Sequence, residues 1–146
     1  MNFFRSLFFL WKKEAPESGK ADDSPRTFFD YRERAPEVLR YLRRERKIAR
    51  RDLELIMIDN EEEPAWQVAH VAERLLPEVK LLTIVTGRQE YFSELEQEAF
   101  EEYGLLVIIA DVRGGKPSGN LTLDLRDWEK QLDILPGEGY NNISNQ

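Results

Sequence analysis

The sequence contains no cysteine and only one histidine among its 146 residues. Disulfide bonds, thiolate metal sites, cysteine nucleophiles and zinc sites built from several histidines are therefore excluded. The apolar run at residues 1–11 is shorter than the roughly 20 residues of a membrane-spanning helix. What remains is a chain with 41% hydrophobic and 34% charged residues, which is typical of one globular domain with tails.

The charge is distributed unevenly. Residues 32–51 hold nine basic and three acidic side chains, a net charge of +6, whereas residues 52–146 carry −13. The basic stretch predicts a helix from Pro36 to about Arg51. One interpretation is binding to the phosphate groups of nucleic acid or anionic lipid. The other is a solvated helix neutralised by acidic residues of 89–103, in the same chain or a second copy, and the charge of −13 argues against nucleic acid.

The N-terminal residues 1–13 form an amphipathic pattern. In a helix, one face would carry the apolar residues Phe3, Phe4, Leu7, Phe8 and Trp11. We expect no secretory signal, because the leading positive charge and the cleavage site are missing. Residues 1–13 therefore either attach a cytoplasmic protein peripherally to the anionic inner face of the membrane, or pack on their own domain or a partner subunit. Residues 14–26 are a linker, 27–135 the domain and 136–146 a flexible tail.

From residue 52 onward, short apolar runs alternate with helical patterns. The expected strands are 53–58, 81–85, 105–110 and an edge strand at 121–125. The expected helices run from Pro64 to Pro77, with Trp66 and His70 outside the apolar stripe, from Gln89 to Tyr103, and over 127–132. In the helix of 89–103, the apolar stripe consists of Phe92, Leu95, Ala99 and Tyr103.

This order predicts an α/β fold, a three-layer Rossmann-like sheet of about four mostly parallel strands with helices on both faces, preceded by a basic helix. The strand order that we expect is 3-2-1-4. Ligands of such sheets bind beyond the carboxyl ends of the strands. The candidate site residues at these ends are Asp59, Asn60, Thr86, Gly87, Arg88 and Asp111.

The segment from Leu53 to Asp111 resembles the Rossmann NAD(P)-binding domain of shikimate-dehydrogenase-like and other amino-acid-dehydrogenase-like proteins. The likeness lies in the spacing from Ile56-Met57-Ile58-Asp59 to Thr83-Ile84-Val85-Thr86-Gly87-Arg88. The resemblance implies an NADP-dependent dehydrogenase-like enzyme in which Arg88 contacts the 2′-phosphate.

The glycine-rich turn of that family is missing. Asp59-Asn60-Glu61-Glu62-Glu63-Pro64 stands in its place, and its three consecutive glutamates repel a pyrophosphate. We therefore interpret the dinucleotide site as degenerate and expect no bound cofactor. Two other roles stay open for this turn: Mg²⁺ binding by Asp59, the glutamates and Asp111, or capping of the following helix by Asp59 or Asn60.

The sequence offers no nucleophile with an adjacent base, and His70 lies mid-helix without an orienting partner that the sequence identifies. We therefore favour a non-catalytic Rossmann-like domain that acts through protein contacts, with a protein partner or as a homo-oligomer. Trp66 lies off the apolar stripe of its helix, and an exposed tryptophan is typical of a contact surface.

Overall fold

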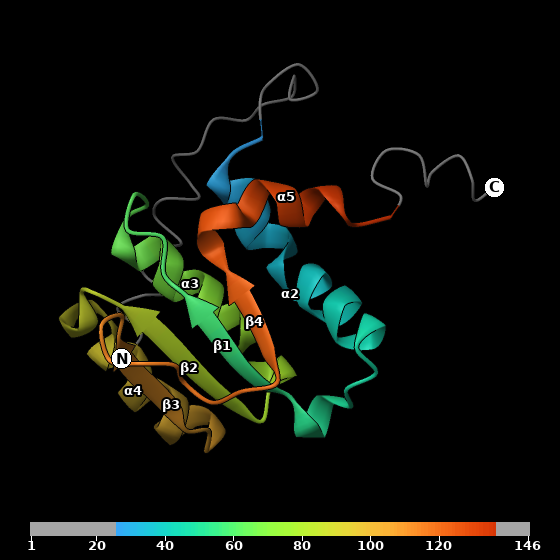
Figure 1. Cartoon of the computed structure of the whole chain (residues 1–146). Coiled ribbons are helices and arrows are strands. Elements are labelled where there is room, and N and C mark those ends of the chain that lie inside the picture. The colour runs from blue at the N-terminus through green and yellow to red at the C-terminus, as the bar shows by residue number, and fades with distance from the viewer. Residues whose placement is uncertain (1–25, 137–146) are drawn as a thin grey trace.

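The computed structural model describes residues 26–136. Four strands form one sheet in the order β3-β2-β1-β4, and every neighbouring pair is parallel (Figure 1). The strands are β1 (Glu54–Ile58), β2 (Leu81–Thr86), β3 (Val107–Asp111) and β4 (Leu121–Asp124). The predicted α/β class, the Rossmann-like parallel sheet, the strand order and the edge position of β4 are thereby confirmed.

The helices lie mainly on one side of this sheet (Figure 1). The α-helices are α2 (Phe28–Glu45), α3 (Ala65–Leu75), α4 (Ser93–Glu98) and α5 (Trp128–Asp133). Single turns flank them: η2 (Arg50–Asp52), η3 (Leu76–Glu78), η4 (Gln89–Phe92), η5 (Ala99–Tyr103) and η6 (Leu125–Asp127). Helix α5 confirms the short helix predicted after the fourth strand.

The core forms between the sheet and these helices. Alternate strand residues such as Leu55, Met57 and Ile84 are completely buried and join one cluster with the apolar side chains of α2 and α3. Alternation is expected, because successive side chains of a strand point to opposite faces of a sheet. The face toward the helices therefore carries most of the hydrophobic stabilisation.

The other face of the sheet is covered by a connector instead of a helix. Residues 112–120 link β3 to β4, which lie at opposite edges, and a right-handed crossover places this link on the face away from α3 and α4. Gly119 touches that face: a Cβ atom there would lie 2.7 Å from Ile56 Cγ1 and 2.8 Å from the Glu54 carbonyl oxygen. Only glycine allows so close an approach. The connector is therefore the third layer.

Helix α2 differs from the predicted basic helix at both ends. It begins at Phe28 because Thr27 and Asp30 form a reciprocal capping box, and it ends at Glu45 before Lys47, whose φ of 58° is left-handed. Pro36, predicted to begin the helix, lies inside it. Proline cannot donate to the Arg32 carbonyl oxygen four residues earlier.

Arg74 of α3 supplies the missing donor. Its Nε donates to the Arg32 carbonyl oxygen and its Nη2 to the Glu33 carbonyl oxygen, both at 3.0 Å. A tertiary contact therefore satisfies the carbonyl that Pro36 leaves open, and the helix continues through the proline. A local rule that places proline in the first turn cannot take this contact into account.

Polar side chains are also buried between α2 and α3. Arg32 lies 4.3 Å from the centre of the Phe29 ring, and its Nη1 donates to Gln67 Oε1 at 3.3 Å. Burial lowers the pKa of Arg32 to about 10. Nearby, His70 Nδ1 lies 3.6 Å from Glu73 Oε1, and burial lowers the pKa of this histidine below its ordinary value. This layer therefore contains charged groups whose protonation depends on the fold.

The predicted helix of residues 89–103 is divided into three parts. Helix α4 follows the turn η4 and continues into η5, a π-helical turn that ends at Gly104 with φ 62°. The wider π-turn shifts the phase of the apolar stripe, so Ala99 is buried but Tyr103 is 43% exposed. The placement of Tyr103 on the buried stripe was wrong, whereas the glycine end of the helix is confirmed.

Candidate functional site

The carboxyl ends of the parallel strands meet at one side of the sheet. The cleft at this side we name the strand-end cleft. Its volume is about 390 Å³. The apolar lining consists of Ile58, Val85 and Val112, and the polar lining of Asp59, Asn60, Glu61, Glu62, Thr86 and Arg126. The cleft lies where parallel α/β sheets bind their ligands.

Asp59 and Arg88 form a hydrogen-bonded ion pair beside this cleft. Arg88 Nε lies 2.8 Å from Asp59 Oδ2 and Nη2 lies 3.0 Å from Oδ1, a bidentate geometry. Thr86 Oγ1 also donates to Asp59 Oδ2 at 2.7 Å. The Asp59 side chain is 1% exposed, and its hydrogen bonds raise the pKa of Arg88 above the ordinary value. The Asp59 carboxylate is therefore buried against the guanidinium of Arg88.

Arg88 also fixes the acidic turn that replaces the glycine-rich loop. Its Nη2 donates to the carbonyl oxygens of Asn60 and Glu63 at 3.0 and 2.8 Å. The guanidinium that the resemblance assigns to a 2′-phosphate therefore binds the first strand end and the following turn of its own chain. In this geometry its role is to position the backbone.

The Glu61 carboxylate binds the first backbone N–H group after β2. Glu61 Oε2 accepts a hydrogen bond from the Gly87 N–H at 2.9 Å. A Cβ atom at Gly87 would approach the same oxygen to 2.8 Å, so the close contact depends on glycine. Free backbone N–H groups at strand ends ordinarily bind anions. Here the chain supplies the anion itself.

The acidic turn does not cap the next helix, so that expectation was wrong. The N-cap of α3 is Pro64, without a side-chain hydrogen bond. Asn60 Oδ1 instead accepts from the Glu62 N–H at 3.0 Å, and Asn60 Nδ2 donates to the Leu125 carbonyl oxygen at 3.3 Å. Asn60 therefore ties the turn to the segment after β4, and Asp59 is bound by Arg88.

Asp111 stands apart from the other five predicted site residues. It pairs with Thr86 in strand register, but its carboxylate binds Arg113 Nη2 at 2.9 Å and Nε at 3.1 Å. These hydrogen bonds lower the pKa of Asp111. Residues 26–136 contain no group of three or more metal-ligating side chains placed to share an ion. Asp59 and Asp111 are thus bound to different arginines and do not converge on a common point.

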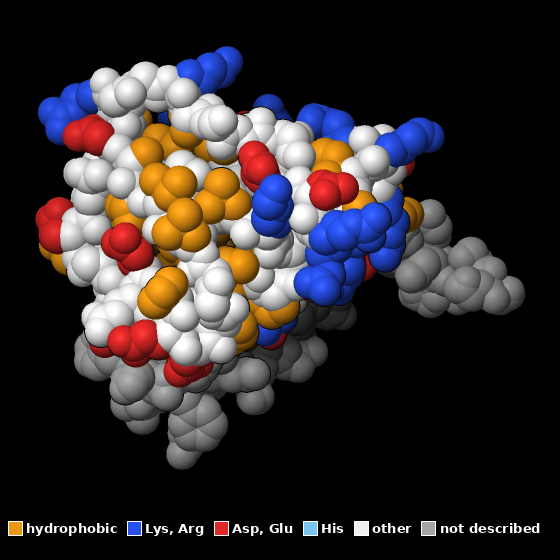
Figure 2. All heavy atoms as spheres, turned by 90° about the horizontal axis from the view of Figure 1, so that it is seen from below, with side chains coloured by type: hydrophobic (Ala, Val, Ile, Leu, Met, Phe, Trp, Pro, Cys, Tyr) orange, Lys and Arg blue, Asp and Glu red, His pale blue; other side chains and the backbone are white. Residues whose placement is uncertain are grey.

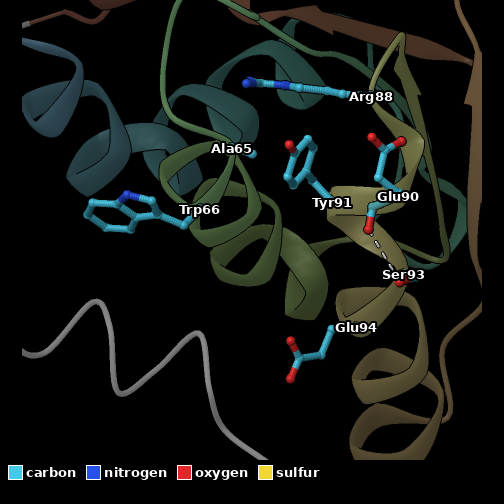
Figure 3. Close-up of a pocket in the computed structure, with 7 residues that line it drawn as sticks. All are labelled: Ala65, Trp66, Arg88, Glu90, Tyr91, Ser93 and Glu94. Atoms are coloured by element: carbon cyan, nitrogen blue, oxygen red, sulfur yellow. Dashed lines mark hydrogen bonds between the residues drawn. The ribbon is translucent and has the colours of Figure 1, made fainter.

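A second cleft, of about 530 Å³, lies between the start of α3 and the segment η4–α4 (Figure 3). Trp66 and Ala65 come from α3, and Glu90 and Tyr91 from η4. Figure 3 shows Trp66 pointing away from Tyr91, and the Ser93 hydroxyl donates to the Glu90 carbonyl oxygen at 3.4 Å. The serine is thus directed at the backbone, and this cleft pairs no nucleophile with a base.

We use the name amino-end face for the opposite side of the sheet, where the strands begin. It exposes apolar side chains around the start of β3: Leu106 is 57% exposed and Phe100 67%. A groove of about 350 Å³ runs between α4 and β3, lined by Ser93, Glu96, Gln97, Phe100, Leu105, Leu106 and Val107. Figure 2 shows hydrophobic side chains gathered in the middle of this view. Phe100 and Leu106 are the two most exposed large hydrophobic side chains of the described residues.

Basic side chains gather beside this apolar surface (Figure 2). The basic cluster consists of the exposed residues Arg44, Arg46, Lys47, Arg50 and Arg51. The described part of the chain contains no ion pair between these residues and the acidic residues of 89–103; Arg40 binds Glu78 instead. Among residues 26–136, the basic cluster is therefore not neutralised by direct pairs with the acidic residues of 89–103, whereas Arg40 of the same basic stretch is paired.

Some contacts of the strand-end cleft and the amino-end face join residues far apart in the sequence, so the sequence alone did not predict them. The pairing of Glu61 with Gly87 joins two turns 26 residues apart, and no local pattern indicates it. Phe100 did give a signal, because it lies outside the apolar stripe of its helix. Leu106 was placed in a buried strand, but β3 begins one residue later, so Leu106 lies at the exposed strand entrance.

No described helix has the length and apolar character needed to cross a membrane. Comparisons with protein-family models, curated proteins and solved structures gave no match. The features of the molecule that bear on function are therefore the two ends of the parallel strands.

Proposed function

We propose that this chain is a non-catalytic Rossmann-like domain that acts through protein contacts at its amino-end face. The observation that carries the proposal is the exposure of Phe100 and Leu106 beside an apolar groove. Exposed apolar side chains grouped in this way, with charged side chains around them, are typical of protein interaction sites. Burial of such residues against a partner supplies the main attraction.

The strand-end cleft supports the non-catalytic part of the proposal. The competing function is an NADP-dependent dehydrogenase-like enzyme, in which Arg88 would bind the 2′-phosphate. Such binding requires Arg88 to leave Asp59, or Glu61 to leave the Gly87 N–H. Each hydrogen bond to a charged group contributes about 1.5–3 kcal/mol, and the three glutamates of 61–63 repel the ligand. Occupation by the chain's own groups therefore disfavours a dinucleotide.

We also propose that the protein is cytoplasmic and that residues 1–13, which lie outside the described residues, attach it peripherally to the inner membrane face. The basic cluster favours this second role, because each cation near an anionic leaflet contributes about 1 kcal/mol. The test is cosedimentation of the full chain with phosphatidylserine vesicles. Deletion of residues 1–13 should abolish binding, and unchanged binding would contradict the tether. Displacement by added RNA would instead indicate a nucleic-acid site.

Site-specific photo-crosslinking in cells tests the protein-contact proposal. We would replace Phe100 by benzoylphenylalanine, with Ile134, an exposed apolar residue after α5, as the matched control position. We expect a discrete protein adduct from position 100 and none from position 134. No adduct from position 100, or equal adducts from both positions, would overturn the proposal.

A further inference from the structure

The charges of the amino-end face follow the order of the strands. Glu101 and Glu102 precede β3 at one edge, and Arg50 and Arg51 precede β1. All parallel strands begin on the same side of the sheet, and neighbouring strands lie about 4.8 Å apart. The charged residues before β3 and those before β1 therefore form the two ends of one row, with only β2 between them. All four charged side chains are exposed. The face is therefore acidic on one side and basic on the other.

The middle of this row has no excess charge. There, between β3 and β1, Lys80 Nζ lies 3.4 Å from Glu54 Oε2, whereas Leu106 enters β3 and lies at the same end of the row as Glu101. In Figure 2 most acidic side chains lie on the side where the hydrophobic ones gather and a group of Lys and Arg lies on the other side, with a few charges of the opposite sign on each side. A row with opposite charges at its two ends and no net charge at its centre is complementary to itself when it is turned around.

The geometry of a two-fold axis makes this explicit. If the axis lies in the plane of the face and perpendicular to the row of charges, each point meets the image of the point on the opposite side of the axis. The acidic end of one chain then meets the basic end of the other, twice, while the Lys80–Glu54 pairs meet at the axis. Such a contact is isologous and closes at two copies.

We propose that the amino-end face is the interface of a homodimer, in which Glu101 of each chain faces Arg51 of the other and the Lys80–Glu54 pair lies near the two-fold axis. This inference rests on the proposed function and identifies the partner as a second copy. A partner of one charge sign would match only one end of the face and would be repelled by the other.

Charge reversal tests the dimer with four full-length variants. The chains Arg51→Glu and Glu101→Lys each place like charges together twice, so we expect the dimer dissociation constant to rise at least about tenfold in sedimentation equilibrium at low salt. The matched controls Lys130→Glu and Glu129→Lys lie on α5, which follows the carboxyl end of β4. The controls should dimerise like the wild type.

A mixture of the two interface variants tests whether restored charge pairs restore the dimer. When Arg51→Glu pairs with Glu101→Lys, each of the two symmetry-related contacts again joins opposite charges. We expect the mixture to recover the affinity of the wild-type dimer to within about threefold, because Coulomb attraction depends only on the signs and the distance. A change that only damages folding would not be rescued by mixing.

The failure of this inference can be separated from failure of the proposed function. A wild-type chain that stays monomeric, or variants that the mixture does not rescue, would overturn the dimer. If position 100 nevertheless crosslinks to a different protein, contact through this face stands and the second copy is wrong. If position 100 gives no adduct, the proposed function itself fails.

Discussion

Removal of the Arg74 side chain tests why α2 continues through Pro36. Arg74→Leu deletes two hydrogen bonds of 3.0 Å to the carbonyl oxygens of Arg32 and Glu33. The Glu33 carbonyl retains its helical donor, but the Arg32 carbonyl has none, since Pro36 lacks an N–H. An unsatisfied buried carbonyl costs about 1–3 kcal/mol, and a lost bond from a charged donor about 1.5–3 kcal/mol. Because these contributions overlap, we expect Arg74→Leu to lower the free energy of unfolding by about 2–4 kcal/mol.

The second variant, Pro36→Ala, gives the Arg32 carbonyl a donor within the helix. In the Pro36→Ala background, Arg74→Leu should lower the free energy of unfolding by about 1–2 kcal/mol less than it does in the wild type. The reason is that the backbone N–H of residue 36 replaces one lost hydrogen bond. The assay is urea unfolding of the wild type, the two single variants and the double variant, with midpoints compared at a constant slope. Additive effects within about 0.5 kcal/mol would refute the explanation.

Three further predictions concern stability. Arg88→Leu should lower the free energy of unfolding, measured by urea titration, by about 3–5 kcal/mol, because it leaves the buried Asp59 carboxylate without its cation. A decrease below about 1 kcal/mol would show that the ion pair is dispensable. Gly104→Ala should cost about 1–2 kcal/mol at φ 62°, and no loss would contradict the left-handed helix end. The pKa of His70 is lowered by burial, so between pH 7 and 5 the unfolded chain takes up the proton first and stability falls as the pH falls. His70→Gln should reduce this slope, and an unchanged slope would exclude His70 as its origin.

The sequence predicted the sheet well because its signals are local and repeated. Buried parallel strands require continuous apolar runs, and β1, β2 and β3 each lie within a predicted run or extend one residue beyond it. The handedness rule and the alternating pattern of the edge strand at 121–125 were consistent with the observed strand order. Secondary structure and topology were therefore accessible without coordinates.

The differences arose where a tertiary contact overrides a local preference. Pro36 is accepted inside α2 because Arg74 reaches it from α3. Tyr103 is exposed because a π-turn changes the helical period, and periodicity alone assumes one period throughout. The second face carries the connector 112–120, since a right-handed crossover fixes the side on which a link runs but does not require a helix.

In the candidate site, too, the sequence indicated which residues lie close together but not which contacts they make. Proximity of Asp59, Thr86 and Arg88 follows from parallel strand ends, which the sequence indicated. The use of Arg88 as a clamp on Asp59, and of the Glu61 carboxylate at the Gly87 N–H, depends on distances between two turns. Such distances are set by the packed fold.

Thermal unfolding of the full chain with NAD, NADP, ATP, S-adenosylmethionine and Mg²⁺ tests most directly whether the strand-end cleft is closed by its own side chains. A ligand at a hundredfold excess over its dissociation constant stabilises the folded state by about 2.7 kcal/mol, which corresponds to a rise of about 8 °C in Tm for a domain of this size. We predict no shift with any of the five. A rise in Tm with NADP that disappears in Arg88→Ala would contradict the non-catalytic account and indicate that a dinucleotide displaces Asp59 from Arg88.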